Sequence, residues 1–117
     1  MAAVKEILIQ LTKAATATGS MIVGRDGLVL ASTGNLGSES EGIGAVTSSG
    51  LGAFESLGEG LKFGSMDQLL GIFTGGVAII QNLTGDLLLL VVAESNANLA
   101  MLRHGINKHK ADLVASL

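Results

Sequence analysis

The run LLLLVVA, Leu87 to Ala93, constrains the fold of this chain more than any other stretch. It is too short to cross a bilayer, because a membrane-spanning helix needs about 20 apolar residues. A strand that is apolar at every position is covered on both faces, and such strands lie in the middle of a sheet. The run therefore predicts a central β-strand with helices packed on both sides of its sheet.

Short apolar runs separated by turn residues predict the other strands. Asp26-Gly27 is a strong signal for a hairpin with a two-residue turn, and Gly75-Gly76 and Thr84-Gly85 divide the later apolar segments. The expected strands span residues 20–25, 28–32, 69–74, 77–83 and 86–94.

Two segments with helical spacing flank these strands. In residues 3–18 apolar side chains recur every three or four positions, as in an amphipathic helix that ends near Gly19. The last segment starts at the expected caps Ser95 and Asn96 and carries a second apolar stripe. The stripe residues are Val4, Ile7, Leu8, Leu11, Ala15 and Thr18 in the first segment and Leu99, Leu102, Ile106 and Leu113 in the last.

Between the second and third strands lies GIGAVTSSGLGAFESLGEGLKFG, in which Gly-x-Gly recurs at intervals of eight residues. On a helix, at about 100° per residue, the stretch sorts into three separate faces. We expect an apolar face against the sheet, a face of small residues against a partner, and a polar face. In that order they are Ile43, Val46, Gly50, Phe54, Leu57 and Leu61; Ala45, Ser49, Gly52, Ala53, Ser56 and Gly60; and Glu41, Ser48, Glu55, Glu59 and Lys62.

A helix over this stretch has a high intrinsic cost, because six glycines lie between Gly42 and Gly60. Each glycine costs about 1 kcal/mol relative to alanine, so packing has to offset roughly 5–6 kcal/mol. The apolar face can do this against the sheet, and the small face lets another backbone approach closely. The alternative is a mobile, glycine-rich segment.

The composition points to self-association. Of the 117 residues, 48 % are hydrophobic and 15 % are charged, and the net charge is −3. A compact protein of 11.8 kDa exposes roughly 5,900 Å², so we expect part of the apolar surface to lie in an oligomer. Without a basic cluster or an aromatic platform, nucleic-acid binding is not expected. The sequence has no cysteine and no signal-peptide pattern, and we expect a cytoplasmic protein without a membrane span.

The residue patterns typical of catalysis or cofactor binding are weak. A P-loop follows a strand and ends in Lys-Ser or Lys-Thr, whereas phenylalanine follows Lys62. His104 and His109 point about 140° from each other on a helix, so they do not share a metal ion. Glu55 and Glu59 lie on the polar face with no nucleophile near them in the pattern. We therefore expect no enzyme activity, no cofactor and no metal.

These segments together resemble a known family. The first helix, the hairpin MIVGRDGLVLAS, the middle helix, the run DLLLLVVAES and the closing NANLAMLRHGI are similar to the roadblock / dynein light-chain family over essentially the whole chain. The resemblance implies a single α+β domain, residues 1–117, with α/β/α layers and the element order α-β-β-α-β-β-β-α. It also implies a five-stranded antiparallel sheet in the order 2-1-5-4-3, related to profilin-like and longin folds.

The same resemblance implies a dimer. Family members pair as homodimers or heterodimers through the third strand, which extends the sheet into the partner, and their middle helices lie side by side. Carried onto this chain, the edge strand is Leu69 to Thr74 and the middle helix is Ser40 to Lys62. The interface would comprise Ala45, Ser49, Gly52, Ser56 and Gly60 of the helix and Leu69, Leu70, Gly71, Ile72 and Phe73 of the strand.

The family also implies a function. Bacterial and archaeal members bind or regulate Ras-like small GTPases, whereas others are structural adaptors such as dynein light chains. We therefore expect a noncatalytic dimeric regulator or binding partner of such a GTPase, with a scaffold subunit as the alternative. The middle helix carries no arginine, so it supplies no arginine finger. The candidate GTPase contacts are Glu55, Glu59 and Lys62.

Overall fold

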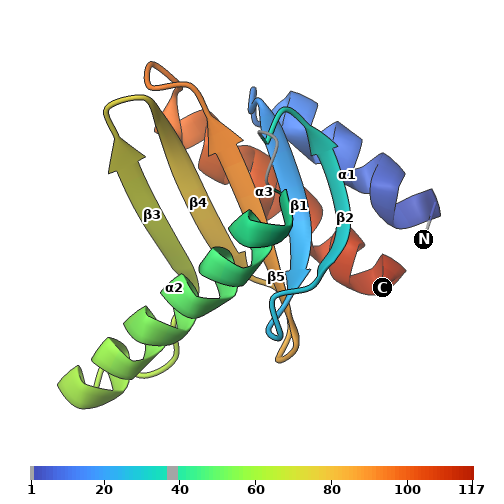
Figure 1. The fold of residues 1–117 in the computed structure, drawn as a ribbon. Coiled ribbons are helices and arrows are strands. Elements are labelled where there is room, and N and C mark those ends of the chain that lie inside the picture. Colours follow the sequence, from blue (N-terminus) through green and yellow to red (C-terminus); the bar gives the residue numbers. More distant parts are fainter. Residues whose placement is uncertain (1, 37–39) are drawn as a thin grey trace.

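The computed structural model of the chain describes residues 2–36 and 40–117 (Figure 1). Its elements follow the order that the sequence predicts. They are α1 (Ala2–Ala14), β1 (Gly19–Gly24), β2 (Val29–Gly34), α2 (Ser40–Leu61), β3 (Gln68–Phe73), β4 (Gly76–Asn82), β5 (Leu87–Ala93) and α3 (Leu99–Ser116). The strands form one antiparallel sheet in the order β2-β1-β5-β4-β3, which confirms the expected topology.

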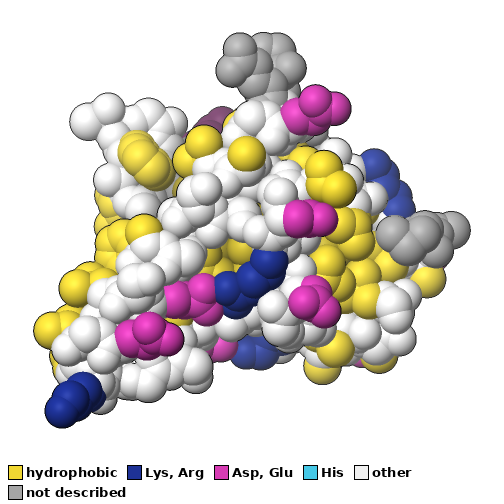
Figure 2. Space-filling model, turned by 60° about the horizontal axis from the view of Figure 1, so that its bottom comes forward, with side chains coloured by type: hydrophobic (Ala, Val, Ile, Leu, Met, Phe, Trp, Pro, Cys, Tyr) yellow, Lys and Arg dark blue, Asp and Glu magenta, His cyan; other side chains and the backbone are white. Residues whose placement is uncertain are grey.

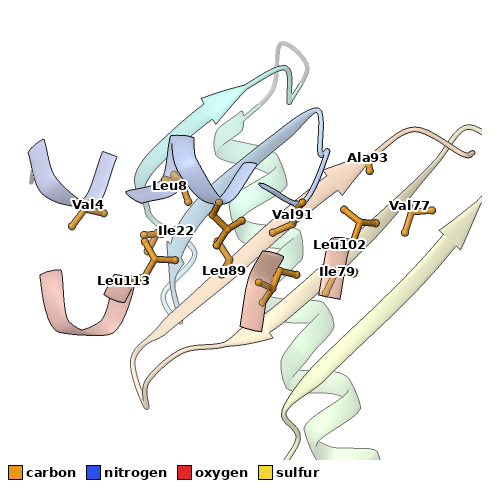
Figure 3. Packing of buried hydrophobic residues seen from close by; sticks show 13 residues of the cluster. Val4, Leu8, Ile22, Val77, Ile79, Leu89, Val91, Ala93, Leu102 and Leu113 are labelled. Carbon is orange, nitrogen blue, oxygen red and sulfur yellow. The ribbon is translucent and has the colours of Figure 1, made fainter. Parts of the chain in front are cut away.

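The apolar strand β5 is central, between β1 and β4, as its composition predicts. On one face of the sheet, α1 and α3 pack against β1, β4 and β5 and form the main hydrophobic cluster (Figure 3). Leu8, Leu89 and Leu102 come from three different elements of this cluster and are each buried. On the other face, a smaller cluster around Met21 and Leu90 includes Ile43 from the first turn of α2. The expected α/β/α layering is therefore confirmed.

Helix α2 is one continuous helix, so the glycine-rich stretch is not a loop. Its buried residues are Gly44, Thr47 and Leu51, and none of its residues beyond Leu51 is buried. The expectation that the apolar stripe faces the sheet is wrong. Ile43 alone of the stripe packs on the sheet, and the larger members beyond it are 47–71 % exposed: Val46, Phe54, Leu57 and Leu61.

The short distance between α2 and the β1–β2 hairpin explains this orientation. A Cβ added at Gly44 would lie 2.8 Å from the carbonyl oxygen of Gly27 and 2.9 Å from a methyl carbon of Val29. Only a small residue can face the hairpin at that distance, since packed atoms need more room. Gly44 therefore sets the rotation of α2 about its axis and turns the apolar stripe sideways, toward β4 and β3.

Local turn chemistry explains where the other elements begin and end. The predicted turn at Asp26-Gly27 is confirmed, although residues 25–28, rather than two residues, separate the strands. Gly27 has φ 89°, and the Asp26 carboxylate accepts a hydrogen bond from the backbone N–H of Leu28 at 3.0 Å. The prediction that Ser95 and Asn96 cap the last helix is wrong. The cap is Asn98, whose side chain accepts from the N–H of Met101.

Candidate functional site

An apolar groove runs between α2 and the half of the sheet that α2 does not cover. It has a volume of about 530 Å³. The alternating side chains of β4 and β5 that point away from α1 and α3 form its floor. Its lining residues are Ala78, Ile80, Leu90 and Val92 of the sheet, Gly42, Ile43, Val46, Thr47 and Gly50 of α2, and Phe73 at the end of β3.

The apolar surface continues along the second half of α2, which extends past β3 to the edge of the molecule (Figure 1). Here Phe54, Leu57 and Leu61 share a second hollow of about 270 Å³ with Phe63, which is 78 % exposed. Figure 2 shows hydrophobic side chains gathered along this flank of the molecule. We call Ile43, Val46, Gly50, Phe54, Leu57 and Leu61 the α2 stripe.

The end of α2 is held by a Schellman motif that places Phe63 beside the α2 stripe. The N–H of Phe63 donates to the carbonyl of Gly58 at 2.9 Å, and the N–H of Lys62 donates to the carbonyl of Glu59 at 3.1 Å. Lys62 occupies the left-handed position of the motif, with φ 61°, although glycine is usual there. Phe63 and Leu57 line the same hollow, which matches the apolar contact that accompanies this motif.

The two edges of the sheet differ. The β2 edge carries a β-bulge, opposite Ile22 and Val23, and Lys5 donates to the carbonyl of Ser32. Bulges and lysines are devices that discourage pairing with another strand. In contrast, β3 pairs with β4 over six residues without a register shift, has no charged residue, and ends in the exposed side chains Ile72 and Phe73. Among the described residues, the open strand edge next to the groove is thus β3.

Arg25, in the β1–β2 turn, holds the middle of α2. Its guanidinium makes a two-pronged ion pair with Glu55, and its Nη2 also donates to Asn82 at 3.3 Å. Its carbonyl oxygen accepts from the hydroxyl of Ser48, two turns before Glu55. The hydrogen bond from Arg25 lowers the pKa of Glu55 below its ordinary range, and the same bond raises the pKa of Arg25. The pair ties α2 to the hairpin beyond its last buried residue, Leu51.

A sequence model of the Roadblock/LC7 domain matches residues 3–93, from α1 through β5. The chain belongs to the Roadblock/LC7 domain family. This membership confirms the resemblance that the sequence patterns indicated.

Two proteins of Methanocaldococcus jannaschii are similar to this Roadblock/LC7 domain along most of their length. MJ0310 is 29 % identical over 114 residues, which cover 97 % of this chain and 98 % of that protein. MJ1340 is 30 % identical over 100 residues, which cover 86 % of this chain and 87 % of that protein.

Solved structures place the chain in the same fold. MglB of Myxococcus xanthus is similar with a TM-score of 0.89 and 17 % identity over 96 % of this chain and 92 % of that one. MglB in a tetrameric arrangement gives a TM-score of 0.88 at 16 % identity, over 96 % and 85 % of the two chains. Profilin II of Acanthamoeba castellanii gives 0.67 at 14 % identity over 96 % of each chain, which agrees with the expected profilin-like architecture.

The structure places the sequence-predicted residues of this Roadblock/LC7 domain in two groups. The strand residues Leu69 to Phe73 lie on the open edge, beside the groove. The small face of α2 points outward: Ala45, Ser49, Ser56 and Gly60 are exposed, and Gly52 is half-buried. Among the described atoms, a Cβ added at Gly42, Gly50, Gly52 or Gly60 would meet nothing within 4 Å.

The predicted polar contacts separate in the same way. Glu59 and Lys62 are exposed near the end of α2, whereas Glu55 is engaged by Arg25. Sequence reasoning missed Arg25, because a single arginine beside a turn gives no sign of a partner 30 residues away. Of the two histidines, His109 contacts the carbonyl of Gly105 through Nδ1 at 3.0 Å.

Over residues 2–36 and 40–117, no group of three or more His, Cys, Asp or Glu side chains is placed to hold a metal ion. In the same residues no helix has the length and apolar character needed to cross a membrane. Among the described residues, an exposed apolar surface extends over the α2 stripe, the groove and the end of β3 at Phe73.

Proposed function

We propose that this Roadblock/LC7 domain is a noncatalytic dimer that binds and regulates a Ras-like small GTPase. One observation carries the proposal: the α2 stripe and the groove form an exposed apolar surface that extends to the end of the open edge strand β3 at Phe73. A face of this kind, bordered by an unprotected strand edge, is typical of a protein that pairs with a second copy.

In the proposed dimer, β3 pairs with its twin and α2 reaches across the seam. The second half of α2 extends past β3, so its Phe54 and Leu57 would reach the partner's groove while the partner's helix fills this one. The accessible surface of 6453 Å² supports this arrangement, because it exceeds the roughly 5,900 Å² of a compact protein of this mass. MglB in its tetrameric arrangement supports self-association of the fold.

The exposures favour the α2 stripe as the helix contact between the two copies. The small face, which the sequence led us to expect at that contact, points away from the sheet and leaves room for a different molecule. In this arrangement the outward residues Ser49, Ser56 and Gly60, with Glu59 and Lys62 beside them, form the platform for the GTPase. That the small face lies between the α2 helices of the two copies stays a prediction. Substitutions at two adjacent residues, one on the small face and one on the α2 stripe, can decide which face makes the contact.

Solution mass tests the dimer, and Leu57→Asp against Ser56→Asp tests its helix contact. Both residues are exposed in the same turn of α2, but Leu57 also lines the hollow that holds Phe63, so circular dichroism has to show an intact fold for each variant before the masses are compared. We expect light scattering to give a dimer for the unaltered chain and for Ser56→Asp, and a monomer for Leu57→Asp. The reverse result would assign the contact to the small face, and a monomeric unaltered chain would refute the dimer.

The GTPase is tested with the purified dimer immobilised and Ras-like GTPases of the same cells loaded with GTP or GDP. We expect preferential capture of one nucleotide state, and Glu59→Lys or Lys62→Glu should weaken that capture while the solution mass is unchanged. Capture of neither state would contradict the GTPase assignment. Nucleotide hydrolysis and exchange of a captured GTPase are then measured with and without the dimer, and unchanged rates would identify a scaffold rather than a regulator.

A further inference from the structure

The edge strand β3 has no alternation that could fix its register. Its sequence QLLGIF presents Leu69 and Phe73 on the side of α2 and Leu70 and Ile72 on the side of α3. Both faces are apolar, so sliding β3 along β4 by one residue would exchange one apolar set for another. In most strands such a slip moves apolar side chains into water, which is what normally specifies the register.

A buried side-chain amide on β4 can specify the register that the apolar pattern of β3 leaves open. Gln81 on β4 is 1 % exposed and lies on the same face of the sheet as the buried side chains of Val77 and Ile79. Its Nε2 lies 2.9 Å from the Oδ1 of Asp67, 3.1 Å from the Asp67 carbonyl oxygen and 3.0 Å from the carbonyl oxygen of Asn82. Its Oε1 accepts from Nε2 of Gln68 at 3.0 Å.

The contact with β3 is fixed in turn by α3. Gln68 is the cross-strand partner of Gln81, and its Oε1 accepts from Nε of Arg103 at 2.8 Å. The chain of bonds runs from α3 through the first residue of β3 to the buried amide of β4 and on to Asp67. A slip of β3 in either direction would move Gln68 and Asp67 away, so the buried amide would keep its bond to the Asn82 carbonyl and lose its bonds to Gln68 and Asp67, a loss that proteins avoid.

We propose that Gln81, acting through Gln68 and Asp67, sets the register of the edge strand β3 at the end of the hairpin opposite its two-residue turn, Thr74-Gly75. It is a positioning residue: it decides which side chains of β3 point to the groove and which to α3. Its consequence for pairing rests on the proposed dimer, since the register fixes the surface that β3 offers to a second copy. The register itself is a property of one chain and can be tested alone.

The absence of cysteine from the sequence permits a direct test by disulfide formation between introduced pairs. Leu69→Cys with Ile80→Cys reports the register of the structure, in which these residues are partners. Leu70→Cys with Ile80→Cys reports a one-residue slip in one direction, and Leu69→Cys with Ile79→Cys reports a slip in the other. Each pair is oxidised mildly, and the disulfide within one chain is separated from bonds between chains by mass under denaturing, nonreducing conditions.

With Gln81 present, we expect only the Leu69/Ile80 pair to form a bond within the chain. In Gln81→Leu, which keeps a similar volume without the hydrogen bonds, at least one slip pair should react at least tenfold faster than with Gln81. Thr12→Val is the matched control, because it removes a buried hydrogen bond to Ser20 far from β3. In that control the slip pairs should stay unreactive.

Slip pairs that remain as slow in Gln81→Leu as with Gln81 would overturn the proposal. If Gln81→Leu does not fold, Gln68→Leu is the second variant, because it breaks the same contact from the less buried strand and carries the same expectation. Solution mass is recorded in parallel. A monomer with a Gln81-dependent register would reject the dimer and keep this inference, whereas a dimer with a register independent of Gln81 would do the opposite.

Discussion

Replacing glycine by alanine in α2 should have opposite effects on protein stability at two positions, Gly44 and Gly52. Gly52 has open space where a Cβ would stand, whereas at Gly44 that Cβ would lie 2.8 Å from the carbonyl oxygen of Gly27. We therefore consider the same substitution, glycine to alanine, at both positions. Helix propensity contributes equally to the two variants, so any difference in their stability reports packing.

The expected magnitudes follow from these distances. Gly52→Ala should raise the free energy of unfolding by about 1 kcal/mol, because alanine loses less backbone entropy in a helix. Gly44→Ala gains the same amount but has to move α2 away from the hairpin, and overpacking of this kind costs about 1–3 kcal/mol. We expect a net loss of about 1 kcal/mol, and thus a difference of about 2 kcal/mol between the variants.

Urea unfolding followed by circular dichroism measures this difference as a change in midpoint. With a slope of about 2 kcal/mol per molar urea, the two midpoints should differ by about 1 M, with Gly52→Ala the higher. Each curve is repeated over a tenfold range of protein concentration, so that association is separated from folding. A rise in the midpoint of Gly44→Ala equal to that of Gly52→Ala would refute the close approach of α2 to the hairpin.

Three further predictions concern contacts inside one chain. A double-mutant cycle with Arg25→Met and Glu55→Gln should give a coupling of about 1 kcal/mol by urea unfolding. Because the folded-state pKa of Glu55 is lowered, this coupling should be present above its ordinary value of 4.5 and vanish as the pH falls through the lowered pKa. Lys62→Gly should raise the thermal midpoint by a few degrees, since it removes the side chain from a left-handed position, whereas Lys62→Ala should not. Gly105→Ala should cost about 1–3 kcal/mol, because its Cβ would lie 2.8 Å from Ala15, the residue after the end of α1, and reduced protection of α3 in hydrogen exchange would report it.

Most of the fold could be predicted because the signals that decide it are local. Turn chemistry at Asp26-Gly27 and the unbroken apolar run of β5 are each contained in a few adjacent residues. Even the glycine-rich helix was predictable, since its three faces appear only when the residues are placed at a helical period. Errors of a few residues at helix ends, such as the cap at Asn98, arise because several polar residues in a row can each serve as a cap.

The candidate site was harder to predict, because it depends on how elements meet. The sequence identified the α2 stripe as apolar but could not say what would cover it, since a helical wheel gives faces without their neighbours. Gly44 decided the rotation, and one glycine among six carried no mark that distinguished it. The Arg25–Glu55 pair and the Gln81–Gln68 pair join residues far apart in sequence, so neither has a sequence signature.

The cost of α2 indicates how the apolar face and the glycines are connected. Four glycines, Gly42, Gly50, Gly52 and Gly60, have no described neighbour that requires their small size, yet together they cost roughly 4 kcal/mol of helix stability. Contacts within one chain offset little of this cost in the part of α2 that follows Leu51, because no residue there is buried. The ion pair of Glu55 with Arg25 joins that part of α2 to the β1–β2 turn. A continuous helix with such a composition is therefore best accounted for if a second molecule supplies the missing contacts. The stability of α2 should then depend on association, which ties the shape of the binding surface to the presence of its partner.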